Sequence, residues 1–83
     1  MSADEIRETV LRLLAEVAPE ADMASIRPDV RLRDQIDIDS MDALNFLIAI
    51  DAELHVDIPE ADYPKLTTLN NIVAYLSGAP PTS

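Results

Sequence analysis

The residues best suited to chemistry gather around one serine, Ser40. Three acids, Asp37, Asp39 and Asp42, surround it in the sequence. A run with helical spacing begins at this serine, and serine and aspartate are both favoured as caps at a helix start. The free backbone N–H groups at a helix start also favour an anion, which suits a phosphate ester on the serine hydroxyl. The pattern therefore predicts a helix cap, a modified serine, or both, since the two interpretations are compatible.

Catalytic and metal-dependent chemistry have less support in the sequence. The lone histidine, His55, has no serine or cysteine near it in sequence, which favours a surface or capping role. The acids near Ser40 do not form an EF-hand loop, because Asp42 stands where that loop requires glycine and Ile48 where it requires glutamate. For acid–base catalysis, paired carboxylates need a pocket that separates their pKa values, and a three-helix domain this small rarely has one. We therefore expect no enzyme activity and only weak, adventitious metal binding.

Length and composition restrict the class of protein. A chain of 83 residues forms one domain and buries only roughly 60% of the surface that its unfolded form exposes. It contains neither a signal-peptide pattern nor an apolar run long enough to cross a membrane, so we expect a cytoplasmic protein. Cysteine is absent, so disulfides are excluded and any thiol chemistry needs a sulfur from outside the chain.

Charge is distributed unevenly along the chain. The net charge is −10, and five of the six basic residues precede residue 34. Residues 34–62 contain nine acids and no lysine or arginine. Nucleic-acid binding depends on neutralising phosphates with lysine and arginine, so this distribution argues against it. It favours protein partners with basic patches, which electrostatic steering brings to the surface quickly.

Apolar spacing predicts an all-α fold, a small bundle of three main helices. The first covers residues 3–17, has a single apolar stripe and stops before Pro19. The second covers residues 40–54. The last begins at Thr67 or Thr68 and ends at Ser77, with Gly78 as its C-terminal cap. The predicted domain spans residues 1–78, and residues 79–83 are expected to form a flexible tail.

Two connections join the predicted helices. The first, residues 19–39, is long for a compact domain, and its aliphatic side chains are spaced to attach it to the core. The second, residues 55–66, contains Ile58 as an expected core anchor. Residues 60–63 can form one short helical turn, which Pro64 should cut off. The long connection ends at Ser40, so we expect it to present the serine.

The helix predicted for residues 40–54 is apolar on two sides. We assign one face to the core, and it consists of Ala43, Phe46, Leu47, Ile50 and Leu54. Met41, Leu44 and Ile48 lie on nearly the opposite side. A helix that is apolar all round is either fully buried or has a docking surface, and a small domain has few elements to cover both faces. The second stripe is therefore expected to be at least partly exposed as a partner patch.

The motif Asp39-Ser40-Met41-Asp42 resembles the Asp-Ser-Leu attachment motif of acyl carrier proteins. The similarity continues without a gap through the following helix, Ile58-Pro59 and Lys65-Leu66-Thr67-Thr68-Leu69, and covers nearly the whole chain. The resemblance implies that the serine carries 4′-phosphopantetheine, transferred from coenzyme A, whose terminal thiol holds an acyl group as a thioester. Ser40 is then the attachment residue, and Asp39 belongs to its motif.

The resemblance also implies which residues meet partner proteins. The partners expected are a phosphopantetheinyl transferase and the enzymes that transfer or modify acyl groups in fatty-acid, polyketide or related synthesis. The positions that match the family's partner-facing set are Met41, Asp42, Leu44, Ile48, Asp51, Glu53 and Glu60. Phe46, Leu47 and Ile50 would line any cavity that shelters the acyl chain. We expect the carrier to act as a monomer.

Departures from the family's pattern support a specialised carrier serving a dedicated pathway at least as well as the housekeeping fatty-acid carrier. Asn45 replaces a common glutamate, and Ala52 interrupts the acidic cluster late in the helix. Two alternatives stay open. One is a carrier of aminoacyl, D-alanyl or peptidyl groups. The other is an unmodified acidic helical adaptor that docks a basic partner through Met41, Leu44 and Ile48.

Overall fold

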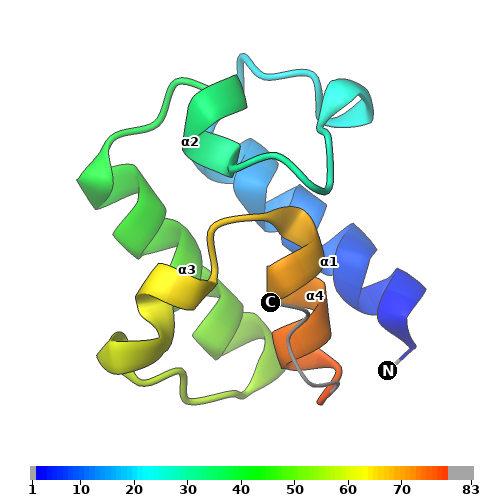
Figure 1. Ribbon diagram of the computed structural model, residues 1–83, viewed down its shortest axis with the longest axis vertical. Coiled ribbons are helices and arrows are strands. Elements are labelled where there is room, and N and C mark those ends of the chain that lie inside the picture. Colours follow the sequence, from blue (N-terminus) through cyan, green and yellow to red (C-terminus); the bar gives the residue numbers. More distant parts are fainter. Residues whose placement is uncertain (1, 79–83) are drawn as a thin grey trace.

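The computed structural model describes residues 2–78, which form a small all-α bundle. In chain order, with η marking a 3₁₀ helix, the elements are α1 (Ala3–Val17), η1 (Met23–Ser25), α2 (Leu32–Gln35), α3 (Ser40–Leu54), η2 (Glu60–Lys65) and α4 (Leu69–Leu76). Helix α1 packs against both α3 and α4 (Figure 1). The predicted fold class is confirmed. The predicted tail, residues 79–83, lies outside the described residues.

The long helices begin and end where their local chemistry predicts. Ser2 caps α1, and the helix stops just before Pro19. Thr68 caps α4, because its hydroxyl accepts a hydrogen bond of 3.1 Å from a backbone N–H in the first turn. Gly78 follows α4 with φ 79°, a left-handed conformation that glycine adopts without strain. These predicted boundaries are confirmed to within one or two residues.

Two predictions about the connections were incomplete or wrong. The long connection contains two short helices, η1 and α2, that its apolar spacing did not indicate. Pro64 was expected to cut off the turn after Pro59, but η2 continues through it to Lys65. The physical reason is that proline's fixed φ of about −65° lies within the 3₁₀ range, so the ring costs this short helix only one N–H donor.

The core lies where α1, α3 and α4 meet. Its buried apolar residues include Val10 and Leu14 of α1, Ile50 of α3, and Leu69 and Ile72 of α4. Burying side chains of this kind stabilises the fold by roughly 1.5–3 kcal/mol each. No helix within residues 2–78 is both long enough and apolar enough to cross a membrane.

The two connections also contribute to the core. Leu32 and Ile38 are buried, which confirms that aliphatic residues attach the long connection to the helices. Ile58 is buried as predicted. Hydrogen bonds then join the long connection to the start of α4, because the N–H of Leu32 donates to the carbonyl of Thr67 at 2.9 Å. This contact holds α2 beside the segment between η2 and α4, and these elements frame one side of α3.

Candidate functional site

Ser40 is the first residue of α3, and it is exposed. The cap of the helix is Asp39, whose carboxylate accepts a hydrogen bond of 2.8 Å from the N–H of Asp42. The carboxylate of Asp42 accepts in return from the N–H of Asp39 at 3.5 Å, which completes a capping box. The sequence pattern allowed either Asp39 or Ser40 as the cap of this helix. The cap is Asp39, so the interpretation of Ser40 as the cap was wrong. The hydroxyl of Ser40 takes no part in the cap and is available for chemistry.

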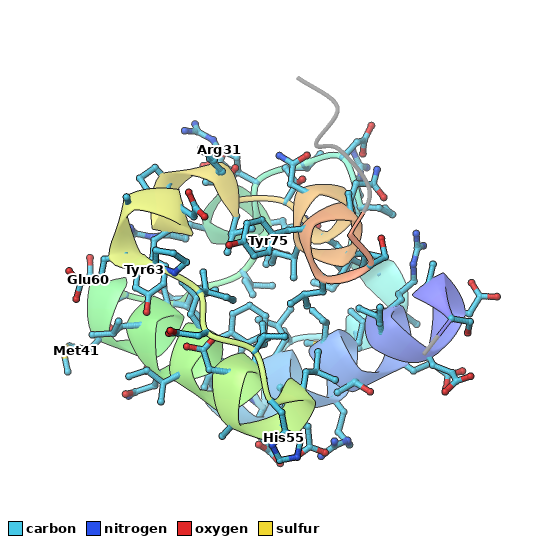
Figure 2. The ribbon with its side chains drawn as sticks, turned by 90° about the horizontal axis from the view of Figure 1, so that it is seen from below. Arg31, Met41, His55, Glu60, Tyr63 and Tyr75 are labelled. Carbon is cyan, nitrogen blue, oxygen red and sulfur yellow. The ribbon has the colours of Figure 1, made fainter. Side chains whose placement is uncertain are left out.

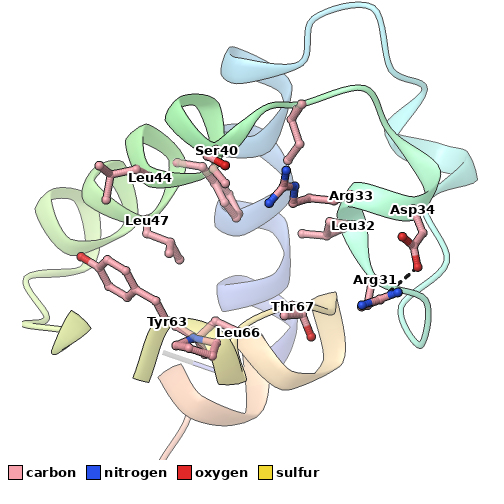
Figure 3. Close-up of a pocket in the computed structure, with 14 residues that line it drawn as sticks. Arg31, Leu32, Arg33, Asp34, Ser40, Leu44, Leu47, Tyr63, Leu66 and Thr67 are labelled. Atoms are coloured by element: carbon pink, nitrogen blue, oxygen red, sulfur yellow. Dashed lines mark hydrogen bonds and ion pairs between the residues drawn. The ribbon is translucent and has the colours of Figure 1, made fainter. Parts of the chain in front are cut away.

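Ser40 lines a groove between α2, α3 and η2, shown in Figure 3. The groove has a volume of about 570 Å³. Its buried lining residues are all apolar and are Leu32, Ile38, Phe46, Leu47 and Leu66. Its exposed lining residues include the charged and polar side chains of Arg31, Arg33, Asp34 and Thr67. The groove therefore has an apolar interior and a polar opening, and Ser40 is one of the exposed residues that line it.

Two of the three residues predicted to line an acyl cavity do line this groove. Phe46 and Leu47 face it, whereas Ile50 is fully buried in the core and is not among its lining residues. Two further lining residues, Arg33 and Tyr63, had no signal in the apolar periodicity. The one available signal for Arg33 was its position among the basic residues just before the acidic stretch.

Helix α3 presents part of its second apolar stripe to solvent. Met41 is 62% exposed and Ile48 is 51% exposed, and these two are the exposed large hydrophobic residues of the described chain. Leu44 is half-buried and lines the groove. The expectation that the stripe is at least partly exposed is confirmed. Leu44 connects the exposed patch with the groove, so the two features are continuous.

The acids predicted to face partners lie in different surroundings. Glu60, at the start of η2, is exposed and points to the same side of the molecule as Met41 (Figure 2). Glu53 forms an ion pair with Arg12 of α1. Asp51 is half-buried, and its Oδ1 atom has no hydrogen-bond partner within residues 2–78. The structure thus groups Glu60 with the exposed patch and ties Glu53 to the neighbouring helix.

His55 ends α3 as its C-terminal cap. It is exposed and has φ 54°, in the left-handed region. Histidine is among the residues that occupy this region more often than most. The predicted surface or capping role is therefore confirmed. Within the described residues, no group of three or more His, Asp or Glu side chains could hold a metal ion.

A hydrogen-bond network holds η2, which forms one wall of the groove, against α4. The hydroxyl of Tyr75 donates to Asp62 at 2.8 Å, and the Nζ atom of Lys65 donates to the same carboxylate at 3.2 Å. The Tyr75 hydroxyl, followed by Lys65, holds the pKa of Asp62 below its usual value. The same hydrogen bond raises the pKa of Tyr75, because the carboxylate stabilises the protonated phenol. The Tyr75 bond therefore joins η2 to α4, whereas the Lys65 bond lies within η2.

Comparison with known proteins decides the family. A family model described as "Phosphopantetheine attachment site" matches residues 8–76. The chain belongs to this family. Proteins named "Acyl carrier protein" from Rickettsia typhi and Rickettsia prowazekii are each 29% identical to it over 75 residues, which is 90% of this chain and 86% of theirs. The protein of that name from Rickettsia canadensis is 28% identical over the same length.

Membership of this family of carrier proteins has direct consequences. The prosthetic group is 4′-phosphopantetheine, and the protein is a carrier, not a catalyst. Its interaction partners as a family member are a phosphopantetheinyl transferase and acyl-processing enzymes in general. The residues at the start of α3 fit such a group, because an exposed hydroxyl lies outside the capping hydrogen bonds and beside an open groove.

Proposed function

We propose that this protein is an acyl carrier in which the hydroxyl of Ser40 bears the phosphopantetheine group. The observation that carries the proposal is that the cap of α3 uses Asp39 and leaves the exposed Ser40 hydroxyl free. When bound, the group supplies a terminal thiol that holds acyl intermediates as thioesters. The chain has no cysteine, so no thiol of its own competes with that one.

The surroundings of Ser40 suit a phosphodiester that extends away from the helix. The capping box holds the first turn of α3, so the backbone position of Ser40 does not depend on hydrogen bonds of its own hydroxyl. Asp37 and Asp39 are exposed near it, and their negative charges repel a phosphodiester from the protein surface at the start of the helix. The arm is thereby directed outward, where partner enzymes can reach it.

The exposed patch of α3 is the proposed docking surface for partner enzymes. Met41 and Ile48 supply exposed apolar area, and Leu44 continues it into the groove. Asp42, Asp51 and Glu60 supply negative charge around this area, which favours partners that present basic patches. Glu53 can contribute only at the cost of its ion pair with Arg12. In this proposal the carrier acts as a cytoplasmic monomer.

The groove's apolar interior supports acyl cargo over aminoacyl cargo. Phe46, Leu47 and Leu66 are buried and offer hydrocarbon surface that an acyl chain can contact. The enzymes served are proposed to be those of fatty-acid, polyketide or related synthesis. The mass of the protein isolated from its own cells identifies the cargo, because it reports the arm together with whatever the thiol holds.

The proposal predicts one covalent modification at one residue. Incubation with coenzyme A and a broad-specificity phosphopantetheinyl transferase should increase the intact mass by one phosphopantetheine group. Ser40→Ala should abolish the increase. Ser77→Ala is the matched control, because Ser77 is also an exposed serine at a helix end, and it should leave the increase unchanged.

Two results would contradict this assignment. An unmodified protein after incubation, with a known carrier modified in the same tube, would exclude the transfer. A mass increase that persists in Ser40→Ala would place the arm elsewhere. The adaptor alternative predicts a different result. In that case the function of the protein does not depend on a modified serine, so Ser40→Ala should leave that function intact.

A further inference from the structure

Within residues 2–78, Arg33 has no carboxylate partner, although the full chain carries 16 acids and only six basic residues. Arg31, two residues earlier, pairs with Asp34 at 3.0 Å. The other ion pairs within residues 2–78 join Arg12 to Glu53 and Lys65 to Asp62. Arg33 belongs to none of these pairs, so no carboxylate of the described residues forms an ion pair with its guanidinium.

Arg33 also shares a groove with Ser40. The two residues come from different elements, α2 and α3, and both line the groove. Figure 3 shows the side chain of Arg33 extending from α2 toward Ser40, whereas Arg31 is turned to its partner Asp34. Leu32 beside it is buried and donates its N–H to Thr67, so the backbone that bears Arg33 is fixed.

We propose that Arg33 binds the phosphodiester of the arm on Ser40. The inference rests on the proposed function, because the phosphodiester exists only if Ser40 is modified. A guanidinium presents several N–H donors in a planar fork that matches the oxygens of a phosphate group, and such charge-assisted pairs are strong among hydrogen bonds. No other arginine combines a free guanidinium with a place in the groove, within the part of the chain that the structure describes.

Charge explains why the carrier benefits from this arginine. Modification of Ser40 adds a negative charge beside Asp37, Asp39 and Asp42, in a protein whose net charge is already −10. Repulsion among these groups disfavours the modified state. Arg33 lines the same groove as Ser40, so its positive charge offsets part of that repulsion.

The test compares the unmodified and modified forms of the protein and of Arg33→Gln. The quantity measured is the change in thermal midpoint that modification causes, after intact mass has shown complete modification. Loss of one exposed charge pair lowers the thermal midpoint of a domain of this size by about 1–8 °C. Modification of Arg33→Gln should therefore lower the midpoint by that much more than modification of the native sequence does.

Arg27→Gln is the matched control for this comparison. Arg27 is exposed, belongs to the same connection and also lacks an ion pair within residues 2–78, but it does not line the groove. Its removal changes the net charge by the same amount. The modification effect in Arg27→Gln should equal that of the native sequence. Equal effects in all three proteins would overturn the proposal.

A second measurement needs no substitution. On modification, the side-chain N–H signal of Arg33 in a ¹⁵N-labelled sample should shift, and that of Arg27 should not. Loading the arm with a malonyl or a butyryl group distinguishes the source of the anion. If the Arg33 signal responds only to malonyl cargo, the arginine binds a cargo carboxylate and the phosphodiester proposal is wrong. A protein that gains no mass at all would instead refute the proposed function.

Discussion

The two apolar sides of α3 contain the same kinds of residue, but one side is buried in the core and the other is partly exposed to solvent. Ile50 is 0% exposed, because α1 packs over its side of the helix, whereas Ile48 is 51% exposed two residues away. The intrinsic hydrophobicity of the two isoleucines is the same. Their different burial therefore comes from the arrangement of the neighbouring helices, which leaves the outer side of α3 uncovered and available for binding.

The elements that support each side differ as well. The core side is held by α1 and α4, which are long and contribute buried aliphatic residues such as Val10 and Ile72. The groove side is framed by α2 and η2, which have only four and six residues. Buried Leu32 attaches α2 to the core, and the hydrogen bond from Tyr75 to Asp62 joins η2 to α4. We infer that changes on the groove side alter the site locally, while changes on the core side alter the stability of the whole domain.

The largest effect is expected for Ile50→Ala on the core side. Removing most of a fully buried isoleucine leaves a cavity and should lower the free energy of unfolding by about 2–5 kcal/mol. In a domain whose total stability is of similar size, this loss should be visible as a large decrease in the urea midpoint followed by circular dichroism.

Ile48→Ala is the matched comparison for that variant, since it makes the same chemical change on the exposed side of the same helix. Its unfolding free energy should change by no more than about 0.5 kcal/mol, while docking to partner enzymes weakens. Equal losses of stability in the two variants would show that the two sides of α3 are not distinct.

An intermediate effect is expected at the start of α3. Asp39→Ala removes the carboxylate that caps the helix and should lower the unfolding free energy by about 1 kcal/mol. Amide hydrogen exchange in the first turn, at Asp42 and Ala43, should accelerate as that turn frays. Asp39→Asn is the control, because asparagine is an equally good cap without the charge, and it should retain both stability and protection.

The losses of stability in Asp39→Ala and Ile50→Ala can be compared with the rates at which the two variants are modified at Ser40. The cap acts through the helix start, so Asp39→Ala should slow modification more than Ile50→Ala does when rates are compared per folded molecule. If Asp39→Asn destabilises the protein as much as Asp39→Ala, the carboxylate acts through its charge and the hydrogen-bond explanation is wrong.

The sequence predicted the features that depend on local chemistry. Helical periodicity and caps set the bounds of the long helices, and the charge and spacing around Ser40 identified the start of α3 as the candidate site. The burial of Phe46 and Leu47 followed from their shared helical face. These predictions needed only residues within a few turns of one another.

The sequence did not predict the features that depend on contacts between distant segments. The groove requires α2 and η2 to meet beside α3, and no periodic pattern specifies that meeting. The bond between Leu32 and Thr67 joins residues far apart in the chain. Arg33 acquires a place beside Ser40 only through this arrangement. The ion pair of Glu53 with Arg12 likewise depends on the packing of α1 against α3.

The smallest effect is expected for Tyr75→Phe, which removes one hydrogen bond from the groove side. The Tyr75 hydroxyl holds the pKa of Asp62 below the value that this carboxyl has in the unfolded chain, which is about 4. The bond therefore contributes its full stabilisation at a pH above that unfolded value. This contribution is lost as the pH falls through the lower folded pKa. In base it is lost as the pH rises above 10 through the raised pKa of Tyr75.

The thermal midpoint of Tyr75→Phe should therefore lie slightly below that of the native sequence on a plateau between these limits, and the difference should disappear in acid. Lys65→Met, which removes the second donor to Asp62, should show the same acid dependence with a smaller difference. Because η2 loses a tie to α4 while the core stays intact, Ser40 should still be modified completely. If the difference in thermal midpoint persists unchanged in acid, the Tyr75 hydroxyl stabilises the protein through packing and not through the carboxylate of Asp62. The groove side would then be held by packing, as the core is.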